Sequence, residues 1–300
     1  MTATRSTTGG SVRLRDGRTI GYAQTGDETG VPVVLLPGTP GSRLSAAWML
    51  SGQPEALNGV RLISLDRPGY GTSTPVRRPS FLGVAADLAE LADQLGLDQF
   101  AVLGVSGGGG YAYAAGYALP DRVRRTLVIS GAVPPTRQEL RSAERDVRMM
   151  HWLGGRGRLL LPLLATQMRR AGAGIDTEQG WEQALSRMPA GDRAQLGNRW
   201  RDPAFRAAYA ADVAEAYRST AGFVADCRAL ALGLGFDPAL IRVPVEVWQG
   251  TDDRNVITAA VQRVAAVIPD CRLHLQPGGH LLVLEVIAEA LRVVRESGAR

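Results

Sequence analysis

The sequence FAVLGVSGGGGYAYAAGYAL, residues 100–119, decides the fold class. The apolar run from Phe100 to Val105 predicts a strand that is buried on both faces of a sheet. Four glycines follow Ser106, and the stretch from Tyr111 to Leu119 predicts a helix. A sharp turn from strand to helix needs small residues two before and two after its central residue, and Gly104 and Gly108 hold those positions. The pattern therefore predicts a strained turn that exposes the Ser106 hydroxyl.

On both sides of this stretch, short apolar runs bounded by Gly or Pro alternate with helical patterns. The runs that predict strands are residues 11–15, 19–24, 33–36, 60–65, 100–105, 127–130, 243–248 and 272–275. The patterns that predict helices are residues 81–95, 111–119, 258–267 and 281–295. Near the start, Asp16-Gly17 predicts a tight hairpin turn in which both central residues have positive φ. The alternation predicts right-handed strand-helix-strand units and a mostly parallel, twisted sheet flanked by helices.

The alternation stops after Pro134-Pro135, and the chain from residue 136 to residue 236 has helical patterns only. Strands return at residue 243, so the sheet resumes where the insertion interrupts it. We expect an α/β core formed by residues 1–135 and 237–300, with residues 136–236 as an inserted helical lid. Apolar lid residues, among them Met149, Met150, Trp152 and Met168, are expected to pack the lid onto the core or to line an apolar pocket.

Composition excludes several other classes of protein. No apolar run approaches the roughly 20 residues of a membrane span, and the first thirty residues are polar, so we expect no membrane association, no secretory signal and a cytoplasmic location. The formal charge is +5, but the 34 basic residues are all arginines and are scattered, so no nucleic-acid surface is expected. Cys227 and Cys271 lack the spacing of a disulfide framework or a zinc site. We expect no cofactor and no metal; the expected partner is a small-molecule substrate, and a homo-oligomer stays open.

Ser106 stands in a G-x-S-x-G pattern between a predicted strand and a predicted helix, which is typical of a nucleophile elbow. Two alternatives remain for the glycines that follow it. They could form only a flexible turn, or they could bind a phosphate at the helix N-terminus. The stretch has neither a Walker-type lysine nor a G-x-G-x-x-G register, which argues against the phosphate site.

A hydroxyl nucleophile needs a base, and the chain contains three histidines. His280 is the candidate, because it follows Gly278-Gly279 in the loop after the last predicted strand. His274 lies within that strand, where a structural role is expected. His151 lies in the lid and either lines a pocket or sits on the surface.

The base in turn needs a carboxylate that orients it. Asp252 and Asp253 are adjacent in the loop after the strand predicted at 243–248. Neighbouring side chains in such a loop diverge, so only one of them can face His280. We favour Asp253, and Asp252 is then a solvated loop residue or a helix cap.

Five motifs in this order resemble those of the α/β-hydrolase superfamily, in particular capped serine hydrolases related to esterases, lactonases and proline iminopeptidase-like enzymes. They are PGTPG at 37–41, DRPGYGTS at 66–73, GVSGG at 104–108, GTDD at 250–253 and GGH at 278–280. The resemblance covers nearly the whole chain and implies an α/β-hydrolase fold. It also implies a catalytic triad in the chain order Ser106, Asp253, His280, since the family's G-x-x-D spacing places the acid at Asp253.

The same resemblance implies an oxyanion hole formed by the backbone N–H groups of Thr39 and Gly107. Two positions depart from the related patterns. The family usually begins the first motif with His-Gly, whereas Pro37 stands at the histidine's position here. Proline iminopeptidases typically place a bulky residue after the nucleophile and use acidic groups to hold a free amine, whereas Gly107 follows Ser106 here.

The expected activity is hydrolysis of an ester, thioester or lactone of a small to medium apolar substrate through an acyl-enzyme. Two alternatives stay open. One is a biosynthetic enzyme of the same fold that uses the triad for acyl transfer, cyclisation, carbon–carbon cleavage or elimination, and the other is a ligand-binding sensor without turnover. Arg43 and Arg67, near predicted strand ends, could bind a substrate carboxylate, although such arginines more often brace loops.

Overall fold

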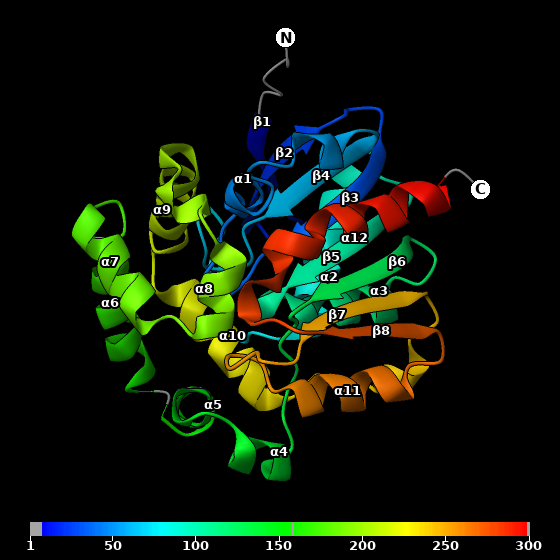
Figure 1. The fold of residues 1–300 in the computed structure, drawn as a ribbon. Helices are drawn as coiled ribbons and strands as arrows, with labels where there is room; N and C mark the ends of the chain where they lie inside the picture. Colours follow the sequence, from blue (N-terminus) through cyan, green and yellow to red (C-terminus); the bar gives the residue numbers. More distant parts are fainter. Residues whose placement is uncertain (1–7, 158, 299–300) are drawn as a thin grey trace.

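An eight-stranded mixed sheet runs through the centre of the molecule (Figure 1). The computed structural model describes residues 8–157 and 159–298; residues 1–7, part of the polar start discussed above, lie outside the described residues. The strands are β1 (Thr8–Arg13), β2 (Thr19–Gly26), β3 (Val31–Leu36), β4 (Val60–Leu65), β5 (Phe100–Val105), β6 (Val123–Ile129), β7 (Val245–Gly250) and β8 (Cys271–Gln276). Their order is β1-β2-β4-β3-β5-β6-β7-β8; β2 is antiparallel to both its neighbours, and β3 to β8 are parallel. The predicted fold class is confirmed.

Several strands begin at residues other than those predicted. β1 begins earlier, at Thr8, and β7 begins later, at Val245. β6 begins at Val123 rather than at Leu127, although two arginines interrupt its apolar run. The second of them fits the sheet because the Arg125 Nη1 donates to the Glu246 Oε1 of β7 at 2.8 Å. A charged residue can lie within a strand when a residue of opposite charge on the neighbouring strand pairs with it.

The hairpin turn between β1 and β2 lies where the sequence predicts it, but its type differs. Gly17 has a φ of 86°, whereas Asp16 does not have a positive φ. The Gly17 N–H donates to the Leu14 carbonyl at 2.9 Å, so Arg15 and Asp16 are the central residues of the turn. Gly17 follows them in the left-handed region, which is the geometry of a three-residue hairpin loop.

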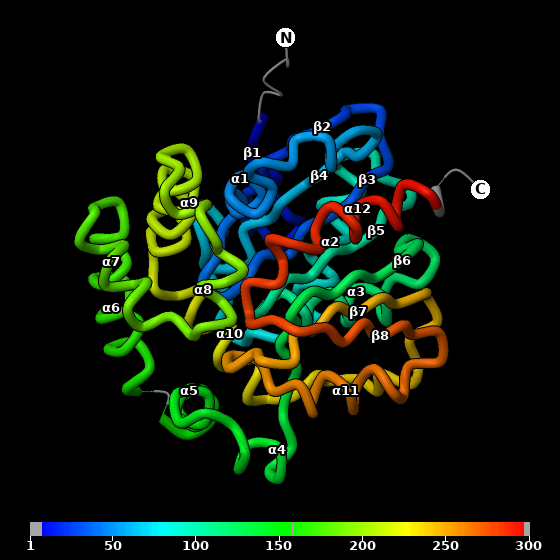
Figure 2. The backbone as a smooth tube through the Cα atoms, viewed as in Figure 1, coloured from blue at the N-terminus to red at the C-terminus, as the bar shows by residue number. Residues whose placement is uncertain are grey.

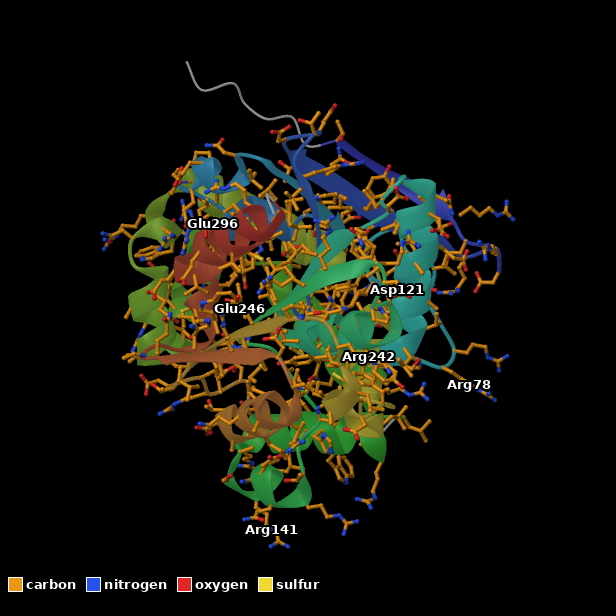
Figure 3. All side chains as sticks on the ribbon, turned by 90° about the vertical axis from the view of Figure 1, so that its right-hand side faces the viewer. Arg78, Asp121, Arg141, Arg242, Glu246 and Glu296 are labelled. Carbon is orange, nitrogen blue, oxygen red and sulfur yellow. The ribbon has the colours of Figure 1, made fainter. Side chains whose placement is uncertain are left out.

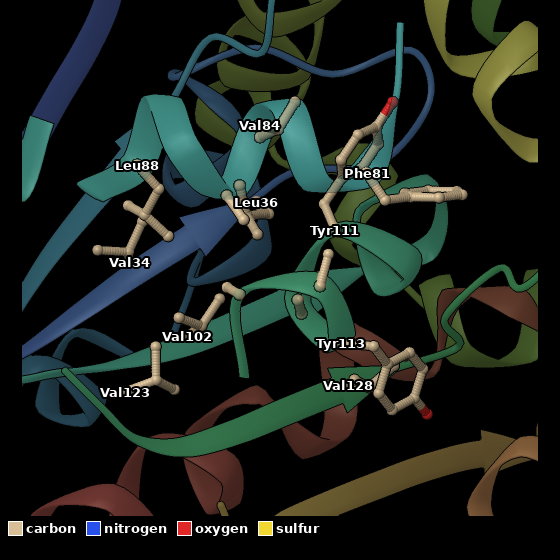
Figure 4. Packing of buried hydrophobic residues seen from close by; sticks show 14 of the residues in the cluster. Val34, Leu36, Phe81, Val84, Leu88, Val102, Tyr111, Tyr113, Val123 and Val128 are labelled. Carbon is tan, nitrogen blue, oxygen red and sulfur yellow. The ribbon is translucent and has the colours of Figure 1, made fainter. Parts of the chain in front are cut away.

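Helices cover both faces of the sheet. Those on one face are α2 (Phe81–Gln94), α3 (Gly109–Ala118) and α11 (Thr258–Val267), and those on the other are α1 (Ser45–Met49) and α12 (Val283–Gly298). Alternate side chains of β3 divide between the two faces, because successive residues of a strand point in opposite directions. Val34 and Leu36 pack with α2, whereas Val33 and Leu35 belong to the cluster that contains α12. Figure 4 shows Val34 beside Leu88 of α2.

In the described residues between β6 and β7, the regular elements are all helices. They are α4 (Arg137–Ser142), α5 (Arg145–Gly155), α6 (Leu161–Gly172), α7 (Glu178–Arg187), α8 (Ala190–Leu196), α9 (Pro203–Ala216) and α10 (Ala221–Leu232), with two short 3-10 helices, Arg199–Arg201 and Pro238–Leu240. In Figure 2 they form the green to yellow part of the tube, at the left of and below the sheet. This inserted helical region is the lid; the division of the chain at residues 135 and 236 stays a prediction.

Several apolar lid residues are more exposed than the sequence suggests. Met150 and Met168 pack against a small lid cluster that includes Phe223. By contrast, Trp152 is 48% exposed and Leu163 is 64% exposed. The amphipathic helices α5 and α6 turn only one side inward, so their apolar composition overstates how much of them packs on the core.

Charged side chains project outward around the molecule, as Arg78, Arg141 and Glu296 do in Figure 3. Among the described residues, no helix combines the length and the apolar character that crossing a membrane requires.

Candidate active site

Ser106 lies at the turn between β5 and α3. Its φ of 52° is in the left-handed region, which costs energy for a residue with a side chain. The turn is tight: a Cβ on Gly104 would lie 2.6 Å from the Gly108 carbonyl oxygen, and a Cβ on Gly108 would lie 2.0 Å from the Leu36 carbonyl oxygen. Glycine is therefore required on both sides of Ser106, and the strained turn has the form that the sequence predicts.

His280 and Asp253 reach Ser106 from loops that follow β8 and β7. The His280 Nε2 lies 2.8 Å from the Ser106 Oγ, and the His280 Nδ1 lies 2.9 Å from the Asp253 Oδ2. The structure thus brings these three residues into one hydrogen-bonded chain. In this geometry the imidazole can accept the hydroxyl proton while the carboxylate faces the other ring nitrogen.

The Asp253 carboxylate is fully buried and accepts hydrogen bonds from several donors. The backbone N–H groups of Asn255 and Val256 each donate to Oδ1 at 2.9 Å, and the Gln249 Nε2 donates to Oδ2 at 3.1 Å. Burial alone would raise the pKa of Asp253, but the facing His280 and the two backbone donors outweigh it and hold the pKa below its usual range. The carboxylate is therefore ionised when it faces the imidazole.

Two opposing effects act on His280. Burial lowers its pKa, but the carboxylates of Asp253 and, to a smaller extent, Asp192 raise it, and the net pKa lies above the ordinary value. The surroundings of the ring therefore stabilise an imidazolium, the state that follows removal of the Ser106 proton.

The other acidic and imidazole candidates lie elsewhere. Asp252 is exposed in its loop. His274 stacks on Trp248 with ring centroids 5.0 Å apart, which is a packing role within the sheet. His151 lines a cavity that also contains Ser106, and burial lowers its pKa.

Thr39 and Gly107 approach each other beside Ser106. A Cβ on Gly107 would lie 2.0 Å from the Thr39 Oγ1 and 3.1 Å from the Thr39 backbone nitrogen. The loop is also close to the serine, since a Cβ on Gly38 would lie 3.3 Å from the Ser106 Cβ. Of the described residues, none accepts a hydrogen bond from the Thr39 N–H. The two backbone N–H groups that the resemblance implicates therefore belong to segments in contact next to the hydroxyl.

A buried cluster braces this loop from behind. The Arg67 guanidinium donates to the Pro37 carbonyl and, at 2.8 Å, to the Gly38 carbonyl. It pairs with Asp226 of lid helix α10, with 2.5 Å between Nη2 and Oδ2. The Thr39 Oγ1 donates to the same Asp226 oxygen at 2.5 Å. Arg67 therefore braces this loop at three consecutive residues. It donates directly to the Pro37 and Gly38 carbonyls, and it shares Asp226 with the Thr39 hydroxyl.

A second lid carboxylate holds the loop that carries His280. Asp192 of α8 accepts a hydrogen bond from the Leu281 N–H at 3.1 Å. The neighbouring Gln195 accepts one from the Gly279 N–H at 3.0 Å. Both side chains are nearly fully buried. Lid helices therefore contact both loops that flank Ser106.

The cavity beside Ser106 has a volume of about 390 Å³, and its wall is largely apolar. Side chains that give it this character are Phe81, Val133, Met150, Phe223, Leu230 and Ile257. Polar side chains enter from Asp146 and His151 on α5 and from Asn255 after β7. The site can therefore accept a compact, mostly apolar ligand with its polar end near Ser106.

Asp192 and Asp226 are not among the site residues predicted from the sequence. A signal for the second was present: Asp226 is the one acidic residue in the otherwise small and apolar stretch AGFVADC, residues 221–227. A carboxylate on the apolar side of a helix has to find buried partners. Which partners it finds depends on how the lid packs, and the sequence does not reveal that.

Comparison with curated proteins finds relatives of different kinds. A probable proline iminopeptidase from Streptomyces coelicolor is 28% identical over 291 residues, covering 88% of this chain and 86% of that protein. A putative 2-succinyl-6-hydroxy-2,4-cyclohexadiene-1-carboxylate synthase from Bacillus subtilis is 33% identical over 141 residues, 46% of this chain and 50% of that protein. The chain thus matches only half the length of the second relative.

Solved structures share the fold at low sequence identity. The enol-lactonase from Burkholderia xenovorans has a TM-score of 0.68 at 18% identity, covering 97% of this chain and 100% of that one. A thermophilic esterase from Thermogutta terrifontis has a TM-score of 0.63 at 20% identity, covering 98% of each chain. A family profile described as alpha/beta hydrolase fold matches residues 31–285. On that match, which spans strands β3 to β8, the lid and the His280 loop, the chain belongs to the α/β-hydrolase fold family.

Proposed function

We propose that the protein is a serine hydrolase that cleaves an ester, thioester or lactone of a small to medium apolar substrate. The observation that carries the proposal is the hydrogen-bonded chain from the Ser106 Oγ through His280 to Asp253, with distances of 2.8 and 2.9 Å. A serine in a strained turn, a largely buried imidazole and an ionised carboxylate are the parts that nucleophilic acyl chemistry needs.

In this mechanism His280 takes the Ser106 proton as the hydroxyl oxygen attacks the substrate carbonyl. The N–H groups of Thr39 and Gly107 hold the oxyanion, each contributing roughly 3 kcal/mol to transition-state stabilisation. The imidazolium then returns the proton to the leaving group, and a water activated by the same ring releases the acyl group. These steps use no metal and no organic cofactor, and the partner is a small molecule rather than a nucleic acid or a membrane.

The carboxylates around the cavity favour an ester or lactone over a peptide with a free amine. Asp226 lines the cavity, but its two oxygens already accept hydrogen bonds from Thr39, Arg67, Tyr70 and Tyr111. A substrate ammonium would find no free oxygen there. The other carboxylate, Asp146, is exposed on the lid.

The test is a panel of p-nitrophenyl esters of two to eight acyl carbons, γ- and δ-lactones, and a prolyl p-nitroanilide, assayed with wild type and Ser106→Ala. We expect turnover of the medium esters or the lactones, and loss of at least about 1,000-fold in kcat for the variant. Turnover of the anilide alone would favour a peptidase. Equal activity of the variant would refute the proposal.

A biosynthetic enzyme that uses the same triad for acyl transfer is the main alternative. Adding an alcohol or amine acceptor to the ester assay separates the two, because a transferase partitions the acyl group to the acceptor while a hydrolase releases the free acid. If no substrate is turned over and Ser106 resists activated esters, a ligand-binding sensor becomes the better account.

A further inference from the structure

We propose that the buried Arg67–Asp226 pair positions the oxyanion donor of Thr39, so that a carboxylate of the lid sets the turnover of a site built on the core. The inference rests on the proposed function, because it assigns a role within acyl chemistry at Ser106. It concerns positioning residues: on this account neither Arg67 nor Asp226 touches the reacting atoms.

The orientation of one peptide plane sets the direction of the Thr39 N–H. The Gly38–Thr39 peptide is trans, and the carbonyl and N–H of a trans peptide point in opposite directions. Arg67 Nη2 holds the Gly38 carbonyl at 2.8 Å. The Thr39 N–H of the same plane is therefore turned away from Arg67, and the Thr39 nitrogen lies beside Gly107. Arg67 thus fixes the direction in which the donor points.

The Thr39 side chain is held by the same carboxylate as Arg67. Its hydroxyl and the Arg67 guanidinium donate to the same Asp226 oxygen, each at 2.5 Å. One carboxylate oxygen therefore fixes the Thr39 residue and the arginine that orients its peptide. The hydroxyl also occupies the space that a side chain at residue 107 would need, since a Cβ there would lie 2.0 Å from Oγ1. The placement of Thr39 against the second donor segment depends on this contact.

The Arg67–Asp226 pair is buried, and its polar groups are saturated with hydrogen bonds. Arg67 is 2% exposed and Asp226 is 7% exposed. Tyr70 and Tyr111 complete the cluster, donating to Asp226 at 2.8 and 2.7 Å while their rings lie 5.1 Å from the guanidinium carbon. A buried pair whose groups are all bonded has little freedom to move. The Arg67 guanidinium therefore holds the Pro37 and Gly38 carbonyls in a fixed position.

A consequence for the lid follows from where Asp226 comes from. Thr39, Arg67, Tyr70 and Tyr111 belong to the core, whereas Asp226 is carried by α10. A lid that moved α10 away would leave Arg67 unpaired and the Thr39 hydroxyl without its acceptor. Turnover therefore depends on α10 staying in place.

The test uses variants that keep the shape of the site. Thr39→Val removes the hydroxyl but keeps the backbone N–H, Thr39→Ser restores a hydroxyl, and Asp226→Asn removes the lid charge. We expect Thr39→Val and Asp226→Asn each to lower kcat by about 10- to 100-fold with KM changed less than about threefold, and Thr39→Ser to recover most of the loss. The double variant of Thr39→Val with Asp226→Asn should lose little more than the worse single, because both act through one contact.

A binding readout separates positioning from mere folding. A trifluoromethyl ketone of the best ester forms an oxyanion adduct with the serine, and its affinity should fall by the same factor as kcat/KM. Affinity for the carboxylate product should not change. Asp87→Asn is the matched control: it breaks another largely buried Asp–Arg pair, with Arg18, outside the site, and should lower the melting temperature without lowering kcat.

Each outcome is decisive. If Thr39→Val and Asp226→Asn lower only the melting temperature, as Asp87→Asn does, the pair is structural and the inference is wrong. Should Asp226→Asn fail to fold, Thr39→Val and Thr39→Ser carry the decision alone. If wild type neither turns over esters nor binds the ketone, the proposed function fails and this inference with it. If wild type does both and the variants equal it, only this inference fails.

Discussion

A methyl group at residue 107 would collide with the side chain of Thr39, because a Cβ there would lie 2.0 Å from the threonine Oγ1. Gly107→Ala is therefore expected to lower kcat by about 100-fold, since it displaces one oxyanion donor and adds bulk beside the other. The clash involves one side chain at the end of a loop, so the fold should persist. Steady-state kinetics on the best ester and far-ultraviolet circular dichroism measure the two effects.

Gly174→Ala is the matched control for that variant. A Cβ on Gly174 would meet no atom within 4 Å, and the residue lies in a lid loop. This change should leave kcat unaltered. Equal activity of Gly107→Ala and Gly174→Ala would show that Thr39 does not hold the position inferred for it.

The pH dependence of kcat/KM should report His280. The ring acts as a base only when neutral, so activity falls as pH drops through its pKa. Because the pKa of His280 lies above its ordinary value of about 6.5, the acid limb should have its midpoint above that pH. Asp253→Asn removes the facing charge while burial remains, so the limb should move to lower pH in the residual activity of that variant. A wild-type midpoint near pH 5.5 would contradict the assignment.

At the scale of single residues, the three members of the hydrogen-bonded chain could be predicted from the sequence, because each follows a strand and carries a local motif. Ser106 has its glycines, His280 follows two more, and Asp253 has the family spacing. Asp226 could not be assigned to Thr39, since those residues are 187 positions apart and meet only through lid packing.

At the scale of single elements, the N-cap residue Ser80 supports helix α2, which packs on the sheet. The Ser80 Oγ accepts the Gly83 N–H at 3.0 Å at the start of the helix, and the helix carries Leu88 and Leu91 into the core. Ser80→Ala should lower the free energy of unfolding by about 1 kcal/mol with kcat unchanged. Urea denaturation followed by fluorescence measures it. Ser186→Ala, at an exposed position within α7, is the control and should change the free energy of unfolding by less than about 0.5 kcal/mol. If both variants lose the same free energy of unfolding, the role of Ser80 as a cap is refuted.

Helices that a local sequence pattern predicts have bounds close to the predicted ones. The helix predicted at 258–267 is α11, and the helix predicted at 81–95 ends one residue earlier, at Gln94. The start of β6 was missed because its arginines look like a strand end until Glu246 of β7 is placed beside them. The hairpin turn type was wrong because the register of β1 against β2 decides it, and the dipeptide Asp16-Gly17 alone does not.

At the scale of the whole molecule, the lid and the core share one apolar cluster. Trp181 of α7 and Phe205 of α9 belong to the same cluster as Leu35 of β3 and Ile287 of α12. Asp212 of α9 adds polar contacts to the core segment 42–48. The inserted helices therefore share a buried core with the sheet, and we expect lid and core to unfold together. The fold class could be predicted from the sequence, whereas these contacts between lid and core could not.

Asp212→Ala tests these contacts between the lid and the core. The carboxylate accepts hydrogen bonds from Ser42, Ser45 and Trp48 at 2.6 to 2.8 Å, and its loss leaves buried donors unpaired. We expect the free energy of unfolding to fall by at least about 3 kcal/mol. Urea titrations followed by lid-sensitive tryptophan fluorescence and by circular dichroism should give coincident single transitions in wild type. Exposed Asp176→Ala is the control; two separate wild-type transitions would mean that lid and core unfold independently.

The central claim is that Ser106, His280 and Asp253 form an assembled nucleophilic site, and intact-mass spectrometry after treatment with a small fluorophosphonate tests it most directly. This reagent modifies activated serines and needs no knowledge of the substrate. The account predicts one label per chain, located on Ser106 by peptide mapping and lost in a folded His280→Ala variant. Folded wild-type protein that stays unlabelled, or labelling that persists at full rate without His280, would contradict it.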